Sequence, residues 1–155
     1  MTDRSALESA VIADVQALSA ESDQIGRVFA GVHSLSANDF RALLHVMVAE
    51  RQGAPLSAGE LRHLMGTSGA AITYLVERMI ESGHLRRESD PGDRRKVILR
   101  YADHGVAVGE QFFLPLAQHF HRMLANLPDT DLAAAHRVLE AVLSAMREFR
   151  SDLES

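Results

Sequence analysis

The chain has 155 residues, of which 46% are hydrophobic, 24% are charged and 5% are aromatic. This composition is typical of one globular domain, or of two small lobes sharing a core, and excludes a disordered chain. The absence of cysteine excludes disulfide scaffolds, cysteine-ligated zinc and thiol chemistry. No stretch approaches the roughly 18 apolar residues of a membrane span, and the N-terminus has no apolar signal core. We therefore expect a cytoplasmic protein that does not contact a membrane.

The net charge of −5 is unevenly distributed along the chain. Residues 56–101 contain eight basic and six acidic residues, a balance of +2. The remainder contains eight basic and fifteen acidic residues, a balance of −7. Within residues 86–100 alone, six basic residues accompany three acidic ones. Positive charge is therefore concentrated in one segment, which is the distribution expected of a nucleic-acid-binding surface in an acidic chain.

The first predicted helix covers about residues 7–32. Apolar residues recur there at a spacing of three to four, which is typical of an amphipathic helix. The helix is either continuous or broken near residues 19–22, and Gly31 is its expected end. It has no earlier element to pack against, so we expect it to pack across a bundle or against a second chain. The apolar positions are Leu7, Val11, Val15, Leu18, Ile25, Val28, Phe29 and Val32.

The second predicted helix begins at Ser36, whose hydroxyl can accept from free backbone amides. Asp39 lies in its first turn, where a carboxylate interacts favourably with the helix dipole. Leu35 and Phe40 have the spacing of a hydrophobic staple. The sequence Gln-Gly-Ala-Pro at residues 52–55 ends this helix.

Two further helices are predicted close together. Ser57 and Glu60 have the spacing of a capping box for a short third helix, which ends near Gly66. Residues 67–68, Thr-Ser, open a fourth helix after a tight turn, and Gly83 closes it. Its inward apolar positions are Ile72, Leu75, Val76, Met79 and Ile80.

The hydrophobic period then changes to that of strands. Residues 85–89 and 96–101 are predicted as two short strands, joined by the turn sequence Asp-Pro-Gly-Asp at residues 90–93. A helix from Asp103 to about residue 126 follows, in which Pro115 should cause a kink or a local break. Asp129 is the expected cap of a last amphipathic helix.

Two helices joined by a tight turn and followed by a basic hairpin predict a winged helix-turn-helix. The second helix of the pair can enter the major groove, and the hairpin can carry arginine to the minor groove and phosphates. The expected fold class is mainly α, with a two-stranded β-hairpin wing and long flanking helices. We expect an N-terminal dimerisation helix at residues 1–34, a DNA-binding lobe at 35–102 and C-terminal dimerisation helices at 103–155.

Four passages of the sequence resemble the MarR family of regulators. They are Val76-Glu-Arg-Met79, Gly83-His-Leu-Arg-Arg87, Asp93-Arg-Arg-Lys96 and Tyr101-Ala-Asp-His-Gly105. With the long helices on either side, the resemblance covers nearly the whole chain. It implies a homodimer that binds double-stranded DNA at a pseudo-palindromic operator. It also implies response to a small, often aromatic or anionic effector that binds between the dimer helices and the DNA-binding lobe.

The resemblance also assigns roles to individual residues. Arg95 matches the arginine that enters the minor groove, Asp93 matches its supporting carboxylate, and Arg94 and Lys96 would contact phosphates. Ser57 and Ser68 stand at helix N-termini whose amides can bind phosphate. The groove face of the fourth helix would be Ser68, Gly69, Ala70, Thr73 and Tyr74.

The sequence departs from the family pattern in three ways. The groove face of the fourth helix is poor in arginine, lysine, asparagine and glutamine, so bidentate reading of bases is weak. Tyr74 stands where a basic residue is common. Ala102 stands where a capping threonine is usual, so Asp103 is the expected cap.

Other classes of function have weaker support. No glycine-rich phosphate loop, nucleophile elbow or HExxH pair is present, so we expect no enzyme and no cofactor. None of the eight histidines are three or four residues apart, so any metal site would need ligands from distant helices. Phe112, Phe113 and Phe120 are expected in the dimer core.

The sequence thus predicts a ligand-responsive repressor or activator. The alternative is a winged-helix protein-interaction or small-molecule-binding module without sequence-specific DNA binding.

Overall fold

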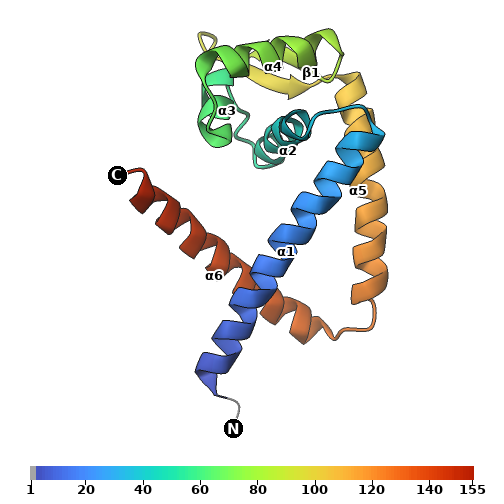
Figure 1. Cartoon of the computed structure of the whole chain (residues 1–155), viewed down its shortest axis with the longest axis vertical. Coiled ribbons are helices and arrows are strands. Elements are labelled where there is room, and N and C mark those ends of the chain that lie inside the picture. Colours follow the sequence, from blue (N-terminus) through green and yellow to red (C-terminus); the bar gives the residue numbers. More distant parts are fainter. Residues whose placement is uncertain (1–2) are drawn as a thin grey trace. The chain divides into compact units, whose positions relative to one another are not determined.

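A computed structural model describes residues 3–155 and contains, over that range, six helices and one two-stranded antiparallel sheet (Figure 1). The predicted fold class is confirmed. The chain divides into two compact units, one up to Phe112 and one from Phe113 to Ser155, with the boundary inside the fifth helix. The elements are α1 (Arg4–Val32), α2 (Ala37–Arg51), α3 (Ala58–Met65), α4 (Gly69–Glu81), β1 (Leu85–Ser89), β2 (Val97–Tyr101), α5 (Asp103–Leu124) and α6 (Asp129–Leu153).

Helix α1 is continuous, so the alternative of a break near residues 19–22 is wrong. These residues are Ser-Ala-Glu-Ser and include no proline, so every backbone amide can donate within the helix. Gly31 lies inside the helix rather than after it, and the cap is His33. At the other end, the Asp3 carboxylate accepts from the Ser5 amide at 3.2 Å.

Local capping explains the positions of α2, α3 and α4, as predicted. Ser36 and Ser57 each form a complete capping box, in which the serine hydroxyl accepts from a backbone amide and an acidic side chain accepts from the serine amide. Ser68 caps α4 by accepting from the Ala71 amide at 3.2 Å. Gly66 adopts the left-handed conformation with φ of 63°, which favours glycine and turns the chain between α3 and α4.

The core of the first unit lies between α2, α3, α4 and the hairpin. Its most buried large side chains come from α2, α3, α4 and both strands, so burial of apolar surface holds these elements together. The Tyr101 hydroxyl donates to the Leu43 carbonyl, and burial raises the pKa of Tyr101. The fully buried side chains are Val46, Leu61, Val76, Met79, Leu85, Ile98 and Leu99.

The hairpin pairs Leu85 with Tyr101 at its base and Ser89 with Val97 near its tip. Lys96 lies one residue before β2, and so belongs to the turn rather than to the strand. The base is also held by the Leu99 amide, which donates to the Leu56 carbonyl at 2.7 Å. The wing therefore projects from a fixed base.

Three expectations for the C-terminal helices are corrected. Helix α5 runs through Pro115 without the local break that was one alternative. It starts at Asp103, and the Ala102 carbonyl accepts from the Val106 amide at 2.9 Å, so Ala102 rather than Asp103 precedes the first turn. Likewise, Pro128 occupies the cap position of α6 in an extended conformation, and Asp129 is the first helical residue. Both aspartates still lie where a carboxylate favours the helix dipole.

Phe112 packs within its own protomer. Its ring centroid lies 4.8 Å from that of Phe29 and 5.0 Å from that of Phe40. This aromatic cluster joins α1, α2 and the first part of α5.

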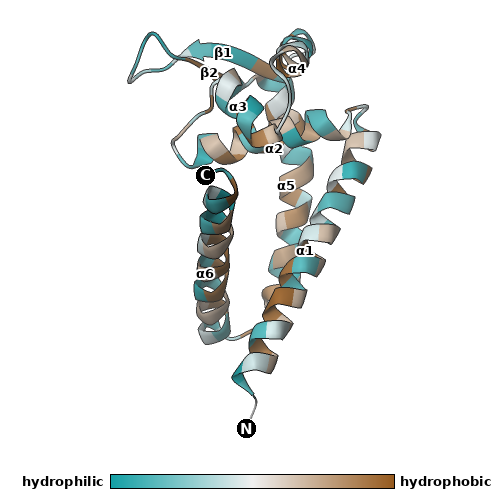
Figure 2. Ribbon diagram, turned by 60° about the vertical axis from the view of Figure 1, so that its left-hand side comes forward, coloured by the Kyte–Doolittle hydropathy of each residue, from teal (hydrophilic) through white to brown (hydrophobic). Residues whose placement is uncertain are grey.

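The long helices leave much apolar surface uncovered. Figure 2 shows hydrophobic residues recurring along α1, α5 and α6, and α6 has no buried residue. Over residues 3–155, none of the helices combines the length and apolarity needed to cross a bilayer. Apolar side chains of α6 that are at least two-fifths exposed are Val138, Leu139, Leu143, Met146, Phe149 and Leu153.

Candidate nucleic-acid interface

Two aspartates fix the tip of the wing. The Asp90 carboxylate accepts from the Gly92 amide at 2.8 Å, and the Asp93 carboxylate accepts from the Arg95 amide at 3.1 Å. The Asp93 carbonyl accepts from the Lys96 amide at 2.9 Å. Asp93 thus supports Arg95 through its backbone amide rather than through its guanidinium. Such Asx turns order the tip before any ligand is bound.

Four of the six basic residues between 86 and 100 already have an acidic partner. Their exposure is partial, and an exposed ion pair contributes only about 0–1 kcal/mol, so a phosphate can compete for these cations. The pairs are Arg86 with Glu88, Arg87 with Glu77, Lys96 with Glu60 at 3.0 Å, and Arg100 with Glu50 at 3.4 Å.

Arg94 and Arg95 are different. Both are exposed, and within residues 3–155 neither guanidinium forms a hydrogen bond or ion pair. The two arginines of the hairpin that lack an acidic partner therefore lie at its tip, close in sequence to Asp90 and Asp93, at the two positions that the sequence assigned to the groove and to phosphate.

The N-terminus of α3 is connected to the wing through one glutamate. Ser57 accepts from the Glu60 amide at 3.2 Å, and the Glu60 carboxylate accepts from the Ser57 amide at 2.7 Å and from the Lys96 ammonium at 3.0 Å. The backbone hydrogen bond from Ser57, followed by Lys96, lowers the pKa of Glu60. The structure thus brings Ser57 and Lys96 together around an acidic residue that the sequence analysis treated only as a cap.

Helix α4 presents an exposed face that is small and weakly polar. Ala70 and Thr73 are exposed, and the Thr73 hydroxyl donates to the Gly69 carbonyl at 2.8 Å, so its proton is used within the helix. Ser68 caps the helix that Gly69 begins. Tyr74 is 69% exposed and is the one large side chain among the five residues predicted for this face.

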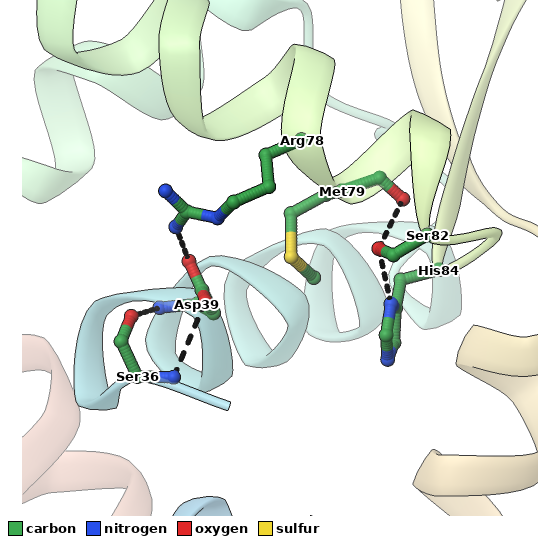
Figure 3. A network of polar contacts seen from close by, with 6 residues as sticks. All are labelled: Ser36, Asp39, Arg78, Met79, Ser82 and His84. Carbon is green, nitrogen blue, oxygen red and sulfur yellow. Dashed lines mark hydrogen bonds and ion pairs between the residues drawn. The ribbon is translucent and has the colours of Figure 1, made fainter. Parts of the chain in front are cut away.

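A polar network behind this face was not predicted from the sequence (Figure 3). The Asp39 side chain is 8% exposed and forms an ion pair with the Arg78 guanidinium, while its second oxygen accepts from the Ser36 amide at 3.2 Å. Arg78 in turn lies with its Cζ atom 5.1 Å from the centroid of the Tyr74 ring. The hydrogen bond to Asp39 is the main cause that raises the pKa of Arg78.

The network borders a surface cavity of about 520 Å³ between α2 and α4. Asp39 and Arg78 are 39 residues apart in sequence, so only the fold brings them together. Lining residues of the cavity are Ser36, Asn38, Asp39, Thr67, Ala71, Tyr74, Leu75 and Arg78.

A further basic residue lies beside the start of α4. A Cβ atom added at Gly69 would be 3.4 Å from the Arg62 guanidinium, and Arg62 is exposed. This places a cation of α3 next to the free amides of α4. The sequence did not predict that Arg62 lies near Gly69, because this proximity depends on the turn at Gly66.

As for metals, no three histidine, aspartate or glutamate residues in the described part of the chain gather into a possible site.

Known proteins with similar sequences are regulators with a helix-turn-helix. A MarR family model matches residues 33–96, from the end of α1 to the wing. The multiple antibiotic resistance protein MarR of Escherichia coli is 27% identical over 103 residues, which cover 66% of this chain and 72% of that protein. The uncharacterized HTH-type transcriptional regulator YcgE of Bacillus subtilis is 42% identical over 48 residues, which span 31% of each chain.

Solved structures support the same fold. A MarR family protein from Bacillus stearothermophilus superposes with a TM-score of 0.67 at 22% identity, covering 95% of this chain and 99% of that one. A mutant of S. aureus MepR bound to an oligodeoxyribonucleotide superposes with a TM-score of 0.54 at 14% identity, covering 85% and 94%. At these identities the structures establish the fold alone. The chain is thus similar in sequence to the MarR family over residues 33–96 and shares the winged helix-turn-helix fold of the solved structures.

Proposed function

We propose that the chain is a transcriptional regulator that binds double-stranded DNA as a homodimer at a pseudo-palindromic operator. The observation that carries this proposal is the wing tip, where two unpaired arginines stand on a turn already ordered by Asp90 and Asp93. A preordered cationic tip loses little conformational entropy when it contacts a polyanion. The MepR structure with bound oligodeoxyribonucleotide supports the same use of this fold.

Under this proposal the residues have the roles that the resemblance to the MarR family implies. Arg95 would enter the minor groove, Arg94 and Lys96 would contact phosphates, and the helix N-termini that Ser57 and Ser68 cap would offer amides to the DNA backbone. Lys96 would exchange Glu60 for a phosphate. Helix α4 would lie in the major groove, with Ser68, Gly69, Ala70, Thr73 and Tyr74 facing the bases.

Apolar surface supports the homodimer. Leu139 and Leu143 of α6 are 47% and 49% exposed, and Leu7, Ile12 and Leu18 of α1 are all more than half exposed. Exposed apolar side chains that recur along a helix indicate an interaction site, and a second copy of the same chain would cover them with the two-fold symmetry that a palindromic operator requires. A regulator of this kind would act in the cytoplasm as a repressor or an activator, and would respond to a small aromatic or anionic effector.

A second candidate function is a winged-helix module that lacks sequence-specific binding. The weakly polar face of α4 favours it, because the Thr73 hydroxyl proton is already used and the face offers no free amide side chain. Under this alternative, the wing would bind any duplex weakly or would bind another protein.

The test is a binding titration of the purified protein with duplex DNA from the flanks of its own gene, repeated across a range of salt concentrations. The proposal predicts specific binding that weakens steeply with salt, because arginine and lysine displace counterions from phosphate. A duplex of scrambled sequence is the control. Equal affinity for both duplexes supports the second candidate, and no binding to either removes DNA from the function.

A further inference from the structure

Arg78 lies over the Tyr74 ring and is itself anchored to the start of α2. The buried Asp39 side chain has both oxygens occupied, one by the Arg78 guanidinium and one by the Ser36 amide. The Asp39 amide also donates to the Ser36 hydroxyl at 3.0 Å, so the carboxylate is fixed to the start of α2. Arg78 therefore links Asp39 to the exposed face of α4, where its Cζ atom lies 5.1 Å from the Tyr74 ring centroid. The exposed Tyr74 ring thus lies beside a guanidinium that is itself fixed by the start of α2.

The chemistry of this face limits what it can recognise. One guanidinium nitrogen of Arg78 donates to the buried Asp39 carboxylate, and this ion pair competes with a bidentate contact to a guanine. The Thr73 proton is used by the Gly69 carbonyl, and the neighbouring positions are glycine and alanine. What remains at 69% exposure is the Tyr74 ring. In the major groove, apolar side chains distinguish thymine through its C5 methyl group.

We propose that Tyr74 determines base specificity by contacting the methyl group of a thymine in each half-site, and that Arg78, anchored by Asp39, positions its ring. This inference rests on the proposed DNA-binding function. Arg78 is a positioning residue in this account, because it acts on DNA through the orientation of Tyr74. The recognised chemistry is an apolar contact to one methyl group, which explains how a helix poor in amide and basic side chains can still select a sequence.

The first experiment selects binding sites from a random duplex pool, using the full-length wild-type protein and three variants. The wild type is expected to enrich a palindrome with a fixed A·T pair at one symmetric position in each half-site. Tyr74→Ala should lose the preference at that position and keep the rest of the motif. Tyr74→Phe keeps the ring and should retain the preference. Arg78→Lys keeps the charge beside Asp39 but lacks a planar group over the ring, and should weaken the preference at the same position only.

The second experiment replaces that thymine with uracil in the selected duplex, which removes only the methyl group. Wild type and Tyr74→Phe should bind the uracil duplex about fourfold more weakly for each half-site, the scale of one buried methyl group. Tyr74→Ala should bind both duplexes equally. Thermal unfolding of each variant shows whether it is folded, and a position-specific loss in a folded variant is something that a purely structural role would not produce.

Two outcomes overturn the inference, and they differ from failure of the proposed function. An unchanged motif in Tyr74→Ala, or equal affinity of the wild type for thymine and uracil at every position of the site, would exclude methyl reading while leaving DNA binding intact. If the wild type enriches no motif at all, sequence-specific binding itself fails. A uniform loss across the motif in Arg78→Lys would exclude its positioning role.

Discussion

Arg94 and Arg95 are adjacent in sequence, but the proposed function gives them different expected roles. If Arg95 enters the minor groove, Arg95→Ala should weaken binding by about 1–3 kcal/mol, the scale of one good groove contact. The loss should be larger where the DNA beneath the wing is A·T-rich, because a narrow minor groove concentrates negative potential. Arg94→Ala should weaken all sequences equally and reduce the salt slope by about one per protomer. Binding titrations on A·T-rich and G·C-rich duplexes measure both effects.

Controls for the wing come from the same hairpin. Arg86→Ala removes a cation that is already paired with Glu88, and should change affinity less than either tip variant. Asp93→Ala removes the acceptor of the Arg95 amide, and should reproduce part of the Arg95→Ala loss. Both tip arginines are exposed, so their removal should leave the melting temperature unchanged. A folded Arg95→Ala dimer with wild-type affinity and wild-type A·T preference contradicts the assigned role.

His84 should make the stability of the fold depend on pH. Its side chain is buried, its Nδ1 atom lies 2.7 Å from the Ser82 hydroxyl, and its Nε2 atom has no hydrogen-bond partner in the part of the chain described. Burial, followed by the neighbouring His104, lowers the pKa of His84, and Asp39 opposes this shift. The unfolded chain therefore binds more protons than the folded one below about pH 6.5, and the free energy of unfolding should decrease as the pH falls through that value.

Thermal unfolding at about pH 7.5 and about pH 5.5 tests this expectation. His84→Phe should reduce the loss of stability on acidification, because it removes the titrating ring and keeps an aromatic group beside His104. His45, whose pKa is lowered by burial and then by Arg41, should supply part of the remaining dependence. His121→Gln, a change at an exposed position, is the matched control. An identical pH dependence in wild type and His84→Phe would show that His84 does not contribute.

At the scale of elements, two substitutions of Ser68 distinguish helix capping from phosphate binding at the start of α4. Ser68→Ala should lower the free energy of unfolding by about 1 kcal/mol, because the Ala71 amide loses its acceptor. Ser68→Asp retains a capping oxygen and should preserve stability, but it adds a negative charge where phosphate is expected. Chemical unfolding and DNA titration of both variants measure the two effects. Stability and affinity that are both unchanged in Ser68→Asp would show that α4 does not begin beside a phosphate.

The elements themselves were largely predictable from sequence because their ends depend on local chemistry. Ser36, Ser57 and Ser68 cap helices by bonds to amides three residues away. The errors are also local: Pro128 occupies the cap position that was assigned to Asp129, and Ala102 precedes the first turn of α5, where Asp103 was the expected cap. Each error displaces a cap by one residue.

The candidate site was less predictable because it depends on residues far apart in sequence. The charge count of residues 86–100 could not show that Lys96 and Arg100 pair with glutamates 36 and 50 residues away. The contact between Asp39 and Arg78 likewise requires α2 and α4 to be packed together. The sequence could identify which residues carry charge, but only the fold shows which charges remain free.

At the scale of the whole molecule, the uncovered helices predict a dimer of twice the 17.0 kDa chain mass. Leu143→Glu places a charge on the apolar stripe of α6 and should shift the protein toward the monomer, with weaker binding to a palindromic duplex. Ser144→Glu adds the same charge at the next residue and should have a smaller effect, because it points to another face of the helix. Sedimentation at micromolar concentration measures the mass. A wild-type monomer would contradict the proposed assembly.

The net charge of −5 is also a property of the whole molecule. An acidic body repels DNA except where cations are concentrated, so orientation on the duplex should depend on the two wings of the dimer. This predicts that the protein binds DNA in one symmetric arrangement rather than along any surface.

Hydroxyl-radical footprinting of the wild-type protein on DNA from the flanks of its own gene tests this claim most directly. Two wings and two α4 helices related by a two-fold axis should protect two half-sites about 34 Å apart, one turn of the duplex, in adjacent major grooves with flanking minor-groove protection. The pattern should be symmetric about its centre, and the minor-groove protection should disappear in Arg95→Ala. A footprint without two-fold symmetry, or none at concentrations where the protein is dimeric, would contradict the account.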